Sequence, residues 1–235
     1  STPDSVRSTL CARLNADVPA CGRGSPADQG EPQRPVDVDA MSIDIDSYDC
    51  SVLREALMVV SPKFLIVEIT PFPPPITAMA EFHPNFQLAE RYNISGDEAI
   101  NGGTGRRGGF WPGCSFSAVI ALLWPHGLGL YRFSGRDAMF VRGDAADEVG
   151  LAEGDAASGG GRWRPSDEFE CWRQGCATAG LDTAQVMDLT AKGVHTHLLP
   201  FIWEQIGTKA PKHPLTLGVA VPPPSRDLPR VRREE

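Results

Sequence analysis

The chain has 235 residues, of which 41% are hydrophobic and 22% are charged, and its formal net charge is −8 at pH 7. That length supports one sizeable hydrophobic core, or a core with an irregular extension. The composition excludes an acidic disordered chain, and the acidic balance argues against a general nucleic-acid or anionic-membrane binder, whose surface should be basic. The longest apolar stretches are a handful of residues, whereas a membrane-spanning helix needs roughly 20.

The first half of the chain predicts a helix, a long loop and then a strand–helix–strand unit. Residues 2–14 carry apolar side chains at every fourth position, which favours a helix. Val36–Asp46 alternates apolar and polar residues, as a half-buried strand does. Cys50–Val60 has an apolar helical face that we expect Pro62 to end, and Lys63–Ile69 is a short apolar run typical of a buried parallel strand. Together these segments predict a right-handed βαβ unit.

A second organised block follows a long irregular segment. Residues 115–124 predict a helix with Ser115 as its N-cap. Two short strands, Leu128–Phe133 and Ala138–Arg142, are separated by a Ser-Gly-Arg-Asp turn, which is typical of a β-hairpin. We therefore expect a helix that leads into a closing antiparallel hairpin.

Glycine and proline number 24 and 21, so part of the chain must be loop. We predict a first domain over residues 1–144, with loop insertions at 19–35 and 70–112. Residues 145–235 are expected to form an irregular, partly helical extension that ends in an exposed tail. Short helices are expected within 166–206.

The six cysteines are too sparse for a disulfide scaffold, and no two of them form a C-x-x-C pair. We therefore expect scattered reduced thiols. The first twenty residues show no signal-peptide pattern, and no stretch is long enough to cross a membrane. These features leave the compartment unknown and favour the cytoplasm.

Four sequence words stand out in this order: S-I-D-I-D-S-Y-D at 42–49, F-L-I-V-E at 64–68, G-C-S-F-S-A-V at 113–119 and D-A-M-F-V-R-G-D at 137–144. Together they resemble the FkbM-type branch of the class I S-adenosylmethionine-dependent methyltransferases. Only the C-terminal half of such a domain is covered. The resemblance implies an α/β fold made of part of a Rossmann-like methyltransferase sheet, corresponding to strands 4 to 7 of the family and ending in an antiparallel hairpin.

The family's glycine-rich cofactor turn is absent before residue 36, and the glycines at 102–109 neither follow a strand nor open a helix. The chain begins at Ser1 rather than Met, so we expect a piece of a longer protein that lacks the first three strands. Such a half-sheet would expose the edge of its first strand. A missing upstream segment or a homo-oligomer is expected to cover that edge.

The resemblance implies S-adenosylmethionine as cofactor and a small-molecule or sugar-like acceptor that is methylated on a hydroxyl group, less readily on an amine. Ligands of open α/β sheets bind beyond the carboxyl ends of the strands. Asp44, Asp46 and Glu68 follow two such strands, so we assign Asp46 and Glu68 to catalysis. Asp44, Asp46 and Tyr48 are assigned to the cofactor. The alternative is that Asp46 or Asp49 merely caps the following helix.

One acid can act as a general base, or the acids can hold Mg²⁺, which favours one or two carboxylates plus water. Asp46 and Glu68 are weak candidates for that metal, and no firm metal site is predicted. Whether the chain is an enzyme stays open, because the glycine-rich motif is missing. Two other functions compete with the methyltransferase. One is a non-catalytic fragment or partner-binding remnant of the fold, and the other is a Mg²⁺-dependent enzyme that uses the same acids without S-adenosylmethionine.

Overall fold

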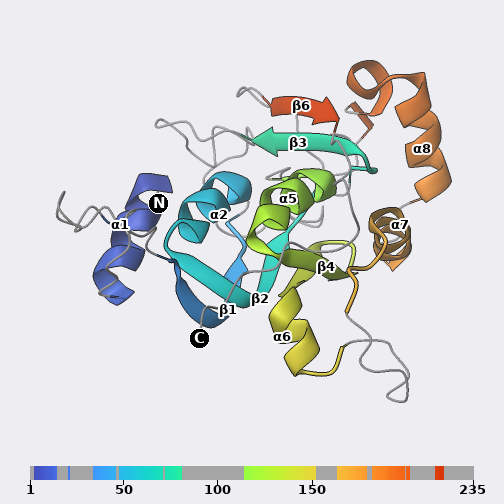
Figure 1. Ribbon diagram of the computed structural model, residues 1–235. Helices are drawn as coiled ribbons and strands as arrows, with labels where there is room; N and C mark the ends of the chain where they lie inside the picture. The colour runs from blue at the N-terminus through green and yellow to red at the C-terminus, as the bar shows by residue number, and fades with distance from the viewer. Residues whose placement is uncertain are drawn as a thin grey trace, which may run out of the picture.

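The computed structural model describes residues 3–14, 21, 34–45, 48–70, 72–80, 114–151, 163–178, 182–198, 200–201 and 215–219. Within these residues the fold is mixed α/β, with a four-stranded mixed sheet and a two-stranded antiparallel sheet (Figure 1). The expected α/β class is therefore confirmed. The elements are α1 (Pro3–Leu14), β1 (Val36–Ile43), α2 (Asp49–Leu57), β2 (Val60–Glu68), β3 (Ile76–Ala80), α5 (Phe116–Leu123), the 3₁₀ turn η2 (Trp124–His126), β4 (Leu128–Phe133), β5 (Asp137–Arg142), α6 (Gly143–Glu148), α7 (Glu168–Thr178), α8 (Thr183–Lys192), the short helix η4 (Val194–Leu198) and β6 (Leu215–Val219).

The four-stranded sheet has the order β1-β2-β5-β4. Strands β1 and β2 are parallel and are joined through α2, as the predicted βαβ unit requires. Strand β5 runs antiparallel to both β2 and β4, so the expected hairpin is confirmed and its second strand lies in the interior of the sheet. The helix between β1 and β2 ends at Leu57, and Pro62 lies inside β2 opposite Val38. The expectation that Pro62 ends this helix was therefore wrong.

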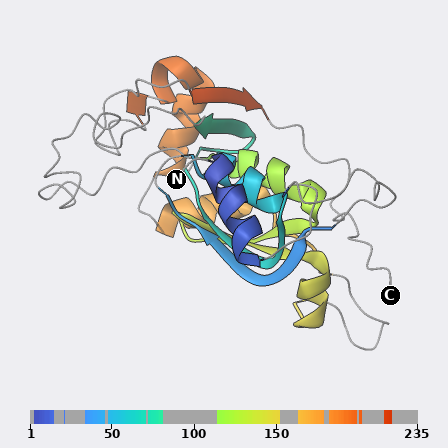
Figure 2. The same cartoon turned by 90° about the vertical axis from the view of Figure 1, so that its left-hand side faces the viewer.

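Helices α1, α2 and α5 lie side by side on one face of the four-stranded sheet (Figure 2). Their apolar side chains pack against those of the strands because α2 and α5 have hydrophobic faces and the strands of the sheet are rich in buried aliphatic residues. The main core contains fully buried side chains from α2, α5, β2 and β5, among them Leu53, Phe116, Val119, Leu65 and Phe140. This core fixes the carboxyl ends of β1 and β2 relative to the helices that follow them.

Residues after 144 also contribute to this core. Trp172 and Cys176 of α7 and Val186 of α8 are buried within it. Gly175 lies between those two residues of α7, where a Cβ atom would be only 2.9 Å from the backbone nitrogen of Gly135. Helix α7 therefore packs closely on the β4–β5 hairpin, and short helices in this region are confirmed.

The two-stranded sheet was not expected from the sequence. Strand β3 lies in the segment 70–112, for which we predicted irregular structure, and it pairs antiparallel with β6 from the C-terminal part of the chain. Each strand has only five residues, which is too short for an alternating pattern to stand out. Residues 81–113, including the glycines at 102–109, lie outside the described residues.

Four of the six cysteines form disulfides, so the expectation of scattered reduced thiols was wrong for them. Cys11 bonds to Cys21 beside α1, and Cys50 at the start of α2 bonds to Cys114 before α5. The second pair is separated by 64 residues, so no local spacing in the sequence indicates it. Cys171 and Cys176 are free.

Strand β1 lies at one edge of the four-stranded sheet, where it pairs with β2 and has no second neighbour among the described strands. In the described part of the chain, no helix has both the length and the apolar character needed to cross a bilayer.

Candidate functional site

The candidate site lies where the parallel strands β1 and β2 end. Ile43 of β1 is paired with Val67 of β2 in the parallel register. Asp44 and Glu68, the residues that follow this pair, therefore emerge at the same edge of the sheet. The side chain of Glu68 is only 6% exposed, whereas Asp44 is exposed to solvent. The two carboxyl groups are close enough for Asp44 to act on the ionisation of Glu68.

The pKa of Glu68 is raised from 4.5 to about 7. Burial is the largest cause, because it disfavours the charged carboxylate, and the negative charge of Asp44 acts in the same direction. Arg136 opposes both by donating a hydrogen bond from Nε to Oε1 of Glu68 at 2.6 Å. The result is a carboxyl group that loses its proton near neutral pH, as a general base or acid should.

Arg136 belongs to the β4–β5 turn, and the sequence analysis missed it. Its backbone carbonyl accepts a hydrogen bond from the amide of Ile69 at 2.8 Å, which fixes the turn beside the end of β2. The sequence predicts only a β-hairpin turn for the Ser-Gly-Arg-Asp segment. The signal that could have revealed this contact was the charge of Arg136, because an arginine is a natural partner for the predicted cluster of acids.

The turn between β1 and α2 is held by Asp49. This buried residue accepts a hydrogen bond at Oδ1 from the amide of Ile45, 3.0 Å away. Tyr48 is the N-cap residue of α2, and its side chain makes no capping bond. The alternative that Asp46 or Asp49 caps this helix stays a prediction. Asp46, assigned to catalysis and to the cofactor, lies outside the described residues.

Tyr48 is 8% exposed and packs within the main core. Its carbonyl accepts hydrogen bonds from the amides of Ser51 and Val52 at 2.9 and 3.1 Å, which begins the first turn of α2. The tyrosine therefore contributes to the start of α2 through its backbone. A role for its ring beside a cofactor stays a prediction.

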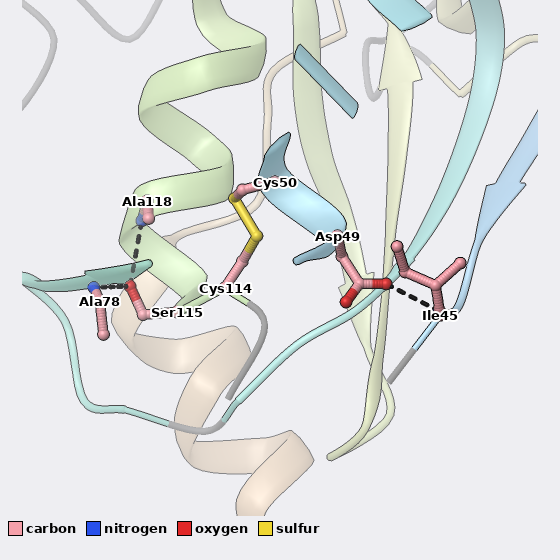
Figure 3. The surroundings of a disulfide bond; sticks show 7 residues. All are labelled: Ile45, Asp49, Cys50, Ala78, Cys114, Ser115 and Ala118. Carbon is pink, nitrogen blue, oxygen red and sulfur yellow. Dashed lines mark hydrogen bonds between the residues drawn. A yellow bond between two sulfur atoms is a disulfide. The ribbon is translucent and has the colours of Figure 1, made fainter. Parts of the chain in front are cut away.

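Ser115 is the N-cap of α5, as predicted. Its Oγ accepts hydrogen bonds from the amide of Ala118 at 3.3 Å and from the amide of Ala78 at 2.7 Å (Figure 3). One side chain thus caps the helix and attaches it to β3. Close by, the hydroxyl of Thr70 is buried and has no hydrogen-bond partner in the structure. Thr70 lies two residues beyond Glu68, on the chain that leaves the site.

No cluster of three or more histidine, cysteine or acidic residues suited to a metal ion occurs within the described parts of the chain. Asp44 and Glu68 supply two carboxylates, which is the ligand type that Mg²⁺ prefers. However, the guanidinium group of Arg136 already neutralises Glu68. The metal role of Asp46 and Glu68 stays a prediction.

The arrangement provides one buried carboxyl group with a pKa near neutrality, one exposed carboxyl group in contact with it and one arginine that limits the shift. It can accept or deliver a proton at the edge of the sheet where ligands of open α/β folds bind. Comparison of the chain with protein-family models, curated protein sequences and solved structures found no match.

Proposed function

We propose that the chain is part of an S-adenosylmethionine-dependent methyltransferase that acts on a hydroxyl group, less readily an amine, of a small-molecule or sugar-like acceptor. The observation that carries the proposal is the contact between Asp44 and Glu68 at the ends of two adjacent parallel strands. The resemblance to FkbM-type enzymes implies that an acid near Asp46 lies beside the cofactor or the substrate, which supports a role for the acids at this edge. The antiparallel hairpin that closes the sheet is a further point of agreement with the resemblance.

In the proposed reaction the cofactor supplies the methyl group, and the protein supplies orientation and proton transfer. Glu68 in its ionised form accepts the proton of the acceptor hydroxyl, because a pKa of about 7 matches the working pH of a general base. Such assistance typically contributes 10²- to 10⁴-fold, about 3 to 5 kcal/mol of the barrier. Arg136 keeps the carboxylate from becoming too basic to ionise.

The residues at this edge fit a nucleoside cofactor in part. Asp44 is exposed and carries the acceptor oxygens that a ribose hydroxyl donates to, so it would hold the cofactor together with Asp46. Burial of the Tyr48 ring leaves its assignment to the adenine dependent on a rearrangement of the turn before α2. The proposal therefore rests on the acids.

Calorimetric titration with S-adenosylhomocysteine, with and without Mg²⁺, tests the proposal. We expect saturable binding that Asp44→Asn weakens at least about 10-fold, which corresponds to the loss of one charge-assisted hydrogen bond. Asp39→Asn is the matched control, because Asp39 lies on the same strand and its side chain is 90% exposed beside Lys63. Binding should be unchanged in this control.

Absence of binding by the folded chain, or equal loss in both variants, would contradict the proposal. In the first case the partner-binding remnant becomes the better explanation. Binding of Mg²⁺ alone, weakened by Asp44→Asn, would instead favour the metal-dependent enzyme that works without S-adenosylmethionine.

We also propose that a strand from an upstream segment or from a second copy of the chain pairs with the outer edge of β1. The support is that β1 has one hydrogen-bonded neighbour among the described strands. A sedimentation experiment on the chain tests the second source. The amide of Val36 donates to β2, and so do those of alternate residues after it, so the amide of Asp39 points to the open edge. A dimer that dissociates when Asp39 on β1 is changed to proline would support pairing between copies, since proline removes a ladder donor at that edge.

A further inference from the structure

The Cys50–Cys114 disulfide joins the start of α2, just after the turn that follows Asp44, to a residue that is hydrogen-bonded to Thr70, two residues beyond Glu68. Figure 3 shows the bond reaching from the first turn of α2 to the residue before Ser115, with Asp49 and Ile45 beside it. The cross-link is therefore positioned to constrain Asp44 and Glu68, the acid pair of the candidate site.

On one side, the path from the disulfide to Asp44 is short. Cys50 follows Asp49, whose Oδ1 accepts the hydrogen bond from the amide of Ile45 at 3.0 Å, and Ile45 follows Asp44. The β1–α2 turn is therefore closed by a bond whose acceptor is adjacent to the half-cystine.

On the other side, the path leads to Glu68. The carbonyl of Cys114 accepts a hydrogen bond from the amide of Thr70 at 2.8 Å, and Thr70 is paired with Ser115 in a parallel bridge. Ile69, between Thr70 and Glu68, donates its amide hydrogen to Arg136 at 2.8 Å. The segment after β2 is thus attached to Cys114 and to the hairpin turn at once.

Both half-cystines are at most 1% exposed. Thiol–disulfide exchange needs access of a thiolate to a sulfur atom, so a reductant in solution does not reach this bond while the chain is folded. The cross-link therefore acts as a permanent constraint of the folded state. It closes a ring that runs from Asp44 through Asp49, the disulfide and Thr70 to Glu68.

We propose that the Cys50–Cys114 disulfide is a positioning element of the candidate site, which holds the turn after β1 against the segment after β2 and so keeps Asp44 in contact with Glu68. The inference rests on the proposed function only for what Asp44 and Glu68 do in the reaction. The contact itself is tested without any cofactor.

The test is the pKa of Glu68, measured by carbon NMR across a pH titration and assigned with Glu68→Gln. The charged groups that act on this carboxyl group are Asp44 after β1 and Arg136 on the hairpin turn. If the turns separate, Glu68 loses the effect of Asp44 and becomes better hydrated, and both changes lower its pKa. In the double variant Cys50→Ala/Cys114→Ala we expect the pKa to fall by about one unit or more.

The matched control removes the other disulfide. Cys11→Ala/Cys21→Ala also deletes one cross-link, but Cys11 packs against Ala56 and Val60, at the ends of α2 and β2 opposite to the acid pair. The pKa of Glu68 should remain at the wild-type value in this control. A folded Cys50→Ala/Cys114→Ala protein in which Glu68 titrates as in the wild type would overturn the proposal.

A second comparison leaves the disulfide intact, in case its removal prevents folding. Asp49→Asn and Asp49→Ala both remove the same charge, but asparagine keeps the oxygen that accepts from Ile45 and alanine does not. We expect a lower pKa for Glu68 in Asp49→Ala than in Asp49→Asn. Equal values in the two variants would show that the path through this turn does not position Asp44.

Discussion

The guanidinium group of Arg136 lies 2.6 Å from the carboxylate of Glu68, although 68 residues separate them along the chain. The hairpin that closes the sheet thereby delivers a positive charge to the end of β2. Arg136 is more than half exposed, whereas Glu68 is buried, so the pair lies at the boundary between core and solvent. Its effect is best measured on the pKa of the buried partner.

Replacing Arg136 by methionine should raise the pKa of Glu68 further above about 7, because Arg136 is the group that lowers it. Carbon NMR of the glutamate carboxyl group measures this shift directly. Arg132→Met, in the neighbouring strand β4, is a control of the same type and should leave the pKa unchanged. A pKa for Glu68 that stays the same in Arg136→Met would contradict the ion pair.

Stability should fall as the pH rises from about 4.5 to about 7, because the unfolded chain releases the proton of Glu68 while the folded chain retains it. The shift from 4.5 to about 7 corresponds to at most about 3 kcal/mol. Urea unfolding at a series of pH values measures this trend. Glu68→Gln removes the ionisation, so the decline should flatten, whereas Glu148→Gln, an exposed change on α6, should keep it.

Gly175→Ala should destabilise the fold by about 2 kcal/mol, a typical cost of overpacking. The added methyl group would meet the ring of Phe133 and would lie 2.9 Å from the backbone nitrogen of Gly135. Backbone atoms of the hairpin turn have little freedom to yield. Thermal or urea unfolding checks the loss, and Gln174→Ala on the exposed side of α7 should stay within about 0.5 kcal/mol of the wild type.

Arg142→Met should cost about 3 kcal/mol, because Arg142 is fully buried and joins three elements. Its Nη1 donates to Asp37 of β1 at 2.5 Å and to Ser61 of β2 at 2.7 Å, and its Nε donates to Asp144 of α6 at 2.7 Å. Asp37→Asn removes one charged acceptor at the exposed end of this network and should cost less. Equal losses in the two variants would show that Arg142 acts through Asp37 alone.

The βαβ unit and the hairpin could be predicted because their hydrophobic patterns are local. The period of two in β1, the helical face of α2 and the apolar run of β2 each lie within about ten residues. The edge that carries Asp44 and Glu68 followed from this local information, because parallel strands end on the same side. Their contact, which the structure adds, depends on the register of β1 against β2.

Most of the contacts that the sequence did not indicate are long-range, and the Cys11–Cys21 bond is the local exception. Pairing of β3 with β6 joins segments more than 130 residues apart, and two five-residue strands carry too little periodicity to reveal it. The Cys50–Cys114 bond and the Arg136–Glu68 pair also join residues that lie far apart along the chain. Pro62 was misleading for another reason, since proline can also occupy a strand where no ladder donor is needed.

Forming the two disulfides requires an acceptor for the electrons of four thiols while the chain folds. Thiol pairs of this kind stay oxidised in compartments such as the periplasm or the secretory pathway, and the glutathione and thioredoxin systems of the cytosol keep them reduced. The two cross-links therefore weigh against a cytoplasmic location. The cytoplasmic location, which the sequence favours, stays a prediction. A recombinant chain made in an ordinary reducing cytosol would carry free thiols at Cys50 and Cys114, so the choice of expression host decides which form is studied.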